Sequence, residues 1–115
     1  MPAMKTTLFF LFSTLMLLLT ACSNKSTLPT VTLSEQQLKL FEQSCKTCHG
    51  NASNPAPQIG DKAAWDKRLE QGLPTLVQHA LQGFNAMPAG GLCTTCTPPD
   101  FEAMIVYMAT AQAQK

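Results

Sequence analysis

The segment Cys45-Lys46-Thr47-Cys48-His49 places two thiols and an imidazole at the spacing that attaches a c-type haem. Two thiols one helical turn apart can add to the two vinyl groups on one edge of a porphyrin, which forms two thioether bonds. His49 then lies beneath the ring, where an imidazole nitrogen can bind the iron as proximal ligand. A bare C-x-x-C also suits a redox dithiol or half a zinc site, but no second ligand pair at zinc-finger spacing accompanies the His. We therefore predict one covalently bound haem c.

The ligand opposite His49 decides the chemistry, because a thioether raises the reduction potential and saturates the iron against oxygen or peroxide. Met87 lies in the Gly- and Pro-rich segment 83–91, where no helical periodicity explains an apolar side chain. Pro88 favours extended backbone at the preceding residue, which would present the Met87 side chain sideways from the loop. We predict Met87 as the second axial ligand. An open sixth position is one alternative, and the other protein candidates are Met104, Met108 and His79.

The composition indicates one small helical domain. The chain has 115 residues and a formal net charge of +1, which gives no reason to propose nucleic acid as a partner. No segment alternates with a period of two, so we predict an all-α fold with about four helices around one haem. Cap and periodicity signals place these helices at 35–49, 62–71, 74–82 and from 98 onward.

Pro57 and Trp65 are candidate neighbours of the haem. A histidine that binds a metal normally donates its other ring N–H to an acceptor, and a carbonyl of the loop 50–60 is the natural one, Pro57 first. Equally, Pro57 could only shape the loop. Trp65 lies on the apolar face of the second predicted helix, which indicates a core residue. Its indole N–H needs a partner if it is buried, and a haem propionate could serve.

Residues 1–21 have the features of a signal peptide. Lys5 supplies a positive charge, and the apolar run 8–19 is too short to span a bilayer. The run ends in Leu19-Thr20-Ala21-Cys22, which resembles the lipobox of bacterial lipoproteins, whose cysteine becomes the lipid-carrying N-terminus. An ordinary secretory signal or an uncleaved anchor is the alternative.

The lipobox implies a mature chain that is tethered to a membrane. Residues 22–32 are polar and contain proline, which predicts a flexible tether, and 33–115 form the domain. Covalent haem attachment suits the extracytoplasmic side, so we expect a periplasmic location. By the same resemblance, Ser23 after the lipidated cysteine favours the outer membrane over the inner one.

Over roughly residues 33–112 the chain resembles class I c-type cytochromes, most closely the cytochrome c5 group. The matching runs are 45–50, 56–65, 81–88 and 93–96. In that family the loop methionine is the sixth ligand and the proline after the haem motif offers its carbonyl to the ligand histidine, which implies these roles for Met87 and Pro57. The resemblance also implies a disulfide between Cys93 and Cys96, with a reducible or catalytic dithiol as the alternative.

The resemblance implies a single-electron carrier with no catalytic residues. Its expected partners are redox proteins such as a quinol–cytochrome c reductase upstream and a terminal oxidase or nitrite reductase downstream. Two other functions stay open: a haem sensor or peroxidase-like enzyme with a labile sixth position, and a thiol–disulfide lipoprotein that uses one of the C-x-x-C pairs.

Overall fold

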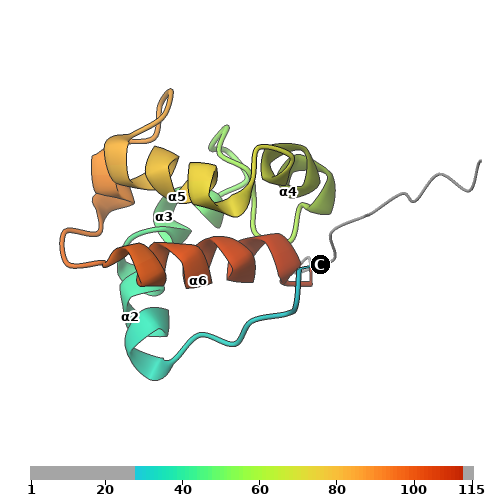
Figure 1. Ribbon diagram of the computed structural model, residues 1–115. Helices are drawn as coiled ribbons and strands as arrows, with labels where there is room; N and C mark the ends of the chain where they lie inside the picture. Colours follow the sequence, from blue (N-terminus) through green and yellow to red (C-terminus); the bar gives the residue numbers. More distant parts are fainter. Residues whose placement is uncertain (1–27, 113–115) are drawn as a thin grey trace, which may run out of the picture.

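The computed structural model of the protein describes residues 28–112, which form an all-α domain (Figure 1). Its elements are α2 (Glu35–Gln43), α3 (Lys46–His49), α4 (Lys62–Leu69), α5 (Leu73–Gln82), the 3-10 helix η1 (Ala89–Leu92) and α6 (Pro98–Thr110). Within the described residues there is no strand, only an isolated bridge between Phe84 and Met87. The predicted fold class is therefore confirmed.

The predicted signal peptide, Cys22 and the first part of the tether lie outside the described residues. None of the helices found in 28–112 is long and apolar enough to cross a membrane.

Side-chain caps fix the helix starts where the sequence predicts them. The Ser34 hydroxyl accepts a hydrogen bond from the Gln37 N–H, and the Gln37 side chain accepts one from the Ser34 N–H, both at 3.2 Å. At α6 the Asp100 carboxylate accepts from the Thr97 N–H at 2.9 Å and from its hydroxyl at 2.7 Å. These hydrogen bonds lower the pKa of Asp100. Both capping boxes satisfy amide groups that have no partner within the helix.

The first helix is interrupted, whereas the sequence predicts one continuous helix over 35–49. At Ser44 the backbone leaves the helical region (φ −132°, ψ −84°), and the Ser44 hydroxyl donates to the Leu40 carbonyl at 2.6 Å. A hydroxyl that bonds back to position i−4 competes with the helix in this way. The spacing i, i+3, i+7 of Leu38, Phe41 and Cys45 also predicts one apolar stripe. Phe41 and Cys45 are buried on either side of the break, but Leu38 is 43% exposed, so its predicted place in the stripe was wrong.

Helix α6 is the central element, since it contacts α2, α4 and α5 (Figure 1). The spacing i, i+3, i+4, i+7 predicts an apolar stripe on this helix, and its residues Phe101, Met104, Ile105 and Met108 are all buried. Phe41 from α2 packs edge-on against Tyr107, with ring centroids 5.2 Å apart. The Gln37 amide also donates to Asp100 at 3.2 Å, which joins the starts of α2 and α6. This frame leaves the space between α3, α4, α5 and α6 for the site.

Candidate haem-binding site

A cavity of about 430 Å³ with mainly apolar walls lies inside this frame. Its size is within the range of pockets that enclose a small molecule or cofactor. The structure brings six predicted site residues to its walls: Cys45, Cys48, Pro57, Trp65, Met87 and His49. Cys93 and Cys96 lie outside the lining.

His49 is oriented by the loop that follows it. The imidazole is buried, and its Nδ1 lies 2.8 Å from the Pro57 carbonyl oxygen. Because a carbonyl can only accept, Nδ1 must carry the proton, which leaves the Nε2 lone pair available for a metal. Burial lowers the pKa of His49, as does the charge of Arg68, although the hydrogen bond to Pro57 opposes them. The neutral, metal-binding form is thus favoured.

Gln58 holds this loop in shape, and its role was missed from the sequence. Its side-chain amide nitrogen lies 2.8 Å from the Ala56 carbonyl and 3.3 Å from the carbonyls of Cys48 and Asn54. Side-chain bonds to the main chain of an irregular loop leave no periodic signal in a sequence. The choice of glutamine within the matching run 56–65 was the only available hint.

Trp65 supports the histidine rather than offering its N–H to a propionate. The indole is 3% exposed, and its N–H donates to the Gln58 carbonyl at 2.8 Å. The predicted alternative of a hydrogen bond to a haem propionate was therefore wrong, because the donor already has a protein acceptor. The indole lines the cavity and lies beside the His49 ring, with centroids 5.8 Å apart.

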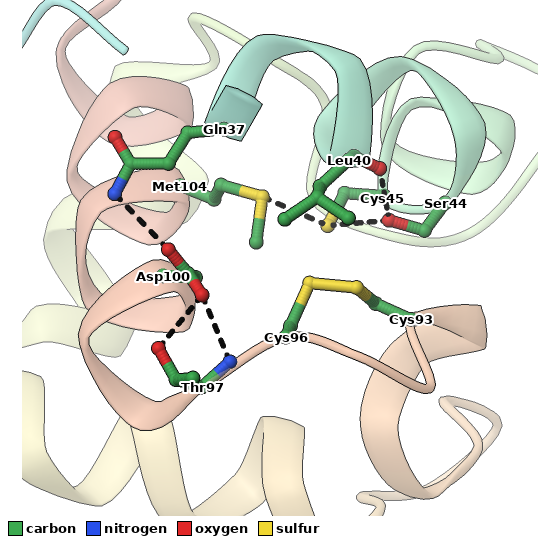
Figure 2. The surroundings of a disulfide bond; sticks show 9 residues. All are labelled: Gln37, Leu40, Ser44, Cys45, Cys93, Cys96, Thr97, Asp100 and Met104. Atoms are coloured by element: carbon green, nitrogen blue, oxygen red, sulfur yellow. Dashed lines mark hydrogen bonds between the residues drawn. A yellow bond between two sulfur atoms is a disulfide. The ribbon is translucent and has the colours of Figure 1, made fainter. Parts of the chain in front are cut away.

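Cys45 and Cys48 are free thiols at the cavity wall. The Cys45 sulfur lies 3.9 Å from the sulfur of Met104 and 3.5 Å from the Ser44 hydroxyl (Figure 2). Burial raises the pKa of the Cys45 thiol, although the hydrogen bond with Ser44 opposes this rise. Redox dithiols need a lowered thiol pKa. The surroundings of Cys45 therefore do not fit a catalytic dithiol and do fit covalent attachment to an apolar group.

Met87 is carried by a short hairpin. Phe84 and Met87 exchange two main-chain hydrogen bonds of 3.0 and 2.9 Å, and Asn85 at the turn takes a positive φ of 51°. Such angles are tolerated by asparagine better than by most residues. Gly91 approaches from η1 so closely that a Cβ there would lie 2.8 Å from the Met87 Cε. The half-buried Met87 thus has a defined position on the cavity wall.

Comparison with known proteins identifies this arrangement. Residues 35–108 match the family described as "Cytochrome C oxidase, cbb3-type, subunit III". Cytochrome c5 of Azotobacter vinelandii is 41% identical over 66 residues, which cover 56% of this chain and 80% of that protein. Cytochrome c5 of Ectopseudomonas mendocina is 37% identical over 71 residues, which cover 60% and 82%. The chain is a class I c-type cytochrome close to cytochrome c5.

The fold of this cytochrome has a solved counterpart at 35% identity. It is a chain from the crystal structure of an electron-transfer complex of nitrite reductase with cytochrome c. The match has a TM-score of 0.58 and covers 68% of this chain and 95% of the other. Cytochrome c-555 of Chlorobaculum tepidum is a further relative, 38% identical over 72 residues that cover 59% of this chain and 67% of that protein.

The cytochrome binds one covalent haem c, as its family does. The residues present fit that group: two free thiols one turn apart, a histidine with an available Nε2 and an apolar cavity. Cys45 and Cys48 would form the thioether bonds and His49 would bind the iron. When bound, the haem supplies a one-electron couple.

The cytochrome has a disulfide between Cys93 and Cys96, with Cα atoms 5.5 Å apart. Figure 2 shows it between the stretch that leaves η1 and the segment that enters α6. The Cys93 N–H donates to the Gly90 carbonyl at 2.8 Å, so the disulfide is also tied to η1. It connects the segment that carries Met87 to the capped start of α6.

Three further residues line the cavity; the sequence gave no reason to place Arg68 and Gln71 there, and it named His79 only as an alternative ligand. Arg68 and Gln71 come from α4 and the turn after it. His79 comes from α5, where its ring stacks on Phe84 with centroids 4.0 Å apart and an interplanar angle of 14°. The positions of these three residues result from the packing of α4 against α5, which helical periodicity alone does not specify.

Proposed function

We propose that this cytochrome is a single-electron carrier of an extracytoplasmic respiratory chain, with the haem iron bound by His49 and Met87. The observation that supports the ligand pair is that both residues line one apolar cavity and both are fixed by neighbouring main chain. A methionine ligand raises the potential, and two protein ligands leave no position for a substrate. The relatives named cytochrome c5 and c-555 support the carrier function.

Protein groups around the cavity would keep the geometry of the haem site the same in the ferric and ferrous states. The Pro57 carbonyl holds the His49 ring in one tautomer and orientation. The apolar walls exclude water and favour the less charged ferrous state. Because neighbouring main chain fixes both His49 and Met87, the protein would rearrange little when the bound haem gains an electron.

One long stretch of the cytochrome carries no charged side chain, and we infer that partners dock on it. No Asp, Glu, Lys or Arg occurs between Glu70 and Asp100, a stretch that forms α5, the Met87 hairpin, η1 and the disulfide loop. Phe84 and Leu92 in this stretch are 47% and 57% exposed, and both border the cavity. The surface fits a redox enzyme whose electron-accepting cofactor lies under an apolar, uncharged patch. The structural counterpart in complex with nitrite reductase supports such a partner.

Electron transfer to nitrite reductase is therefore expected to depend weakly on salt. Stopped-flow mixing of the reduced cytochrome with that enzyme should give a second-order rate constant that changes by about twofold or less as the Debye length shortens from ~30 Å at 0.01 M to ~10 Å at 0.1 M. Phe84→Ala should slow the reaction, whereas Leu38→Ala, an exposed apolar residue on α2 away from the cavity, should not. A steep fall with salt would reject the docking surface, and no electron transfer at all would count against the carrier.

Gly91 should be needed for the position of Met87 and not only for the backbone. Gly91→Ala places a methyl group 2.8 Å from the Met87 Cε, whereas Gly90→Ala meets nothing within 4 Å; both residues have positive φ, 53° and 77°. Each substitution should reduce the free energy of unfolding, measured by chemical denaturation, by about 1 kcal/mol or more, because alanine disfavours a positive φ. Only Gly91→Ala should also weaken the ferric absorption band near the red end of the spectrum that reports iron–sulfur ligation. Equal spectra for the two variants would speak against Met87 as ligand.

The lipid tether at Cys22 stays a prediction of the lipobox-like segment. Its test is fractionation of cells: Cys22→Ser should move the cytochrome from the membrane fraction to the soluble periplasmic extract. If the wild-type cytochrome were found in the soluble periplasmic extract, the tether would be excluded, and the conclusions about the haem site would not change.

A further inference from the structure

We propose that Gln58 is a positioning residue of the haem site: it holds the Pro57 carbonyl against His49 and thereby affects the reduction potential of the cytochrome. The inference deepens the proposed function and rests on it, since it concerns the same centre. It starts from a half-buried polar side chain that lies behind the cavity wall and does not line the cavity itself.

The Gln58 side chain is surrounded by carbonyl groups. Its amide nitrogen lies 2.8 Å from the Ala56 oxygen and 3.3 Å from the oxygens of Asn54 and Cys48. Three acceptors around one position need a group that only donates, and an amide NH₂ does so without bringing a charge. Ala56 and Asn54 belong to the loop after the haem motif, whereas Cys48 belongs to the motif. The side chain therefore joins the motif to its loop.

The main chain next to this side chain is fixed as well. The Trp65 N–H donates to the Gln58 carbonyl at 2.8 Å, which attaches the loop to α4, and the Ile59 N–H donates to the His49 carbonyl at 2.9 Å. Pro57 has no N–H and cannot anchor itself by a main-chain donor. Its carbonyl, which accepts from His49 Nδ1 at 2.8 Å, thus takes its direction from the hydrogen bonds of the residue that follows it.

The direction of the Pro57 carbonyl has a consequence for the redox equilibrium. A hydrogen bond from Nδ1 moves electron density onto the imidazole and makes its other nitrogen a stronger donor to iron. A stronger donor favours the ferric state. A loop that no longer holds Pro57 in place would weaken this hydrogen bond. Loss of the Gln58 amide should therefore shift the equilibrium toward the ferrous state.

The first test is potentiometric titration of the holoprotein. Gln58→Met keeps the length of the side chain and removes the donors without adding a charge. It should shift the ferrous-to-ferric ratio at fixed ambient potential about threefold toward ferrous, which for a one-electron couple is about 28 mV. Gln58→Asn keeps an amide that is one methylene shorter and cannot reach all three oxygens. It should give a smaller shift in the same direction.

Proton NMR of the reduced protein provides a second measurement, which does not depend on the potential. In the wild type the His49 Nδ1 proton is held by Pro57. In Gln58→Met it should exchange with solvent about tenfold faster, because the loop opens more often.

Gln37→Met is the matched control. Gln37 is also half-buried, and its side-chain amide also forms hydrogen bonds, with Ser34 and Asp100, but it lies outside the cavity lining. Loss of these hydrogen bonds should make the control unfold at a lower denaturant concentration. Its reduction potential and its His49 exchange rate should be those of the wild type.

A shift toward ferric in Gln58→Met, equal shifts in Gln58→Met and Gln37→Met, or a wild-type potential and exchange rate in Gln58→Met would overturn the proposal. If Gln58→Met binds no haem, Gln58→Asn decides by the same two measurements. Ferric spectra separate this failure from failure of the proposed function. If the iron–sulfur band is present but the potential does not respond to Gln58, only the role of Gln58 is wrong. If the band is missing in the wild type, Met87 ligation is wrong, and the Gln58 comparison still decides because it concerns His49.

Discussion

Replacing Met87 by alanine is expected to lower the reduction potential of the cytochrome by roughly 0.2 V or more, within the ~0.8 V range over which axial ligands tune haem. Loss of the thioether removes the ligand that favours ferrous iron and opens a coordination position. The ferric band near the red end of the spectrum should disappear. Reduced Met87→Ala should bind carbon monoxide at neutral pH, whereas the reduced wild type should not.

Met104→Ala is the control for a methionine that only fills the core. Met104 is 1% exposed and lies outside the cavity lining. Its truncation should reduce the free energy of unfolding by about 2–5 kcal/mol but preserve the iron–sulfur band and the potential. If Met87→Ala instead kept the band and excluded carbon monoxide, another sulfur ligand would bind the iron, and Met108, the other methionine on the cavity wall, would be the first to examine.

The second large effect concerns stability: a Cys45→Ser, Cys48→Ser double variant should be largely unfolded. Without covalent haem the cavity of about 430 Å³ stays unfilled. At about 24 cal/mol per Å³ of cavity, the loss is of the order of 10 kcal/mol. That equals a typical total stability of ~5–15 kcal/mol. Far-ultraviolet circular dichroism should show little helix and no cooperative thermal transition.

Removal of the disulfide provides the comparison. The Cys93→Ser, Cys96→Ser variant loses a four-residue covalent loop whose closure contributes about 2 kcal/mol by chain entropy. It should bind haem, stay helical and unfold at a lower denaturant concentration. An apoprotein with native helicity after loss of Cys45 and Cys48 would show that the protein core alone is sufficient.

The sequence was most informative where a few adjacent residues determine the structure. The capping boxes at Ser34 and Thr97 form hydrogen bonds between residues three apart in the sequence, so both helix starts could be predicted. The break at Ser44 could not, because a serine inside an apolar stripe can equally face solvent in a continuous helix. Only the packing of α2 on α6, together with the hydrogen bond from Ser44 to Leu40, decides in favour of the break.

The site shows the same division. Cys45, Cys48 and His49 form one sequence motif, so their role in haem binding could be predicted without knowledge of the fold. The pairing of Cys93 with Cys96 came from family resemblance, since spacing alone left a reactive dithiol open. Arg68 was missed because nothing near it in the sequence marks it as facing the haem cavity.

The interruption at Ser44 also separates two parts that would otherwise be mechanically coupled. In a continuous helix, any rotation of α2 about its axis would turn the haem motif with it, by 100° for each residue inserted or lost. Here the motif lies on its own short turn, fixed by the loop that follows it. A change in the length of the N-terminal helix would therefore not by itself turn the haem ligands out of position.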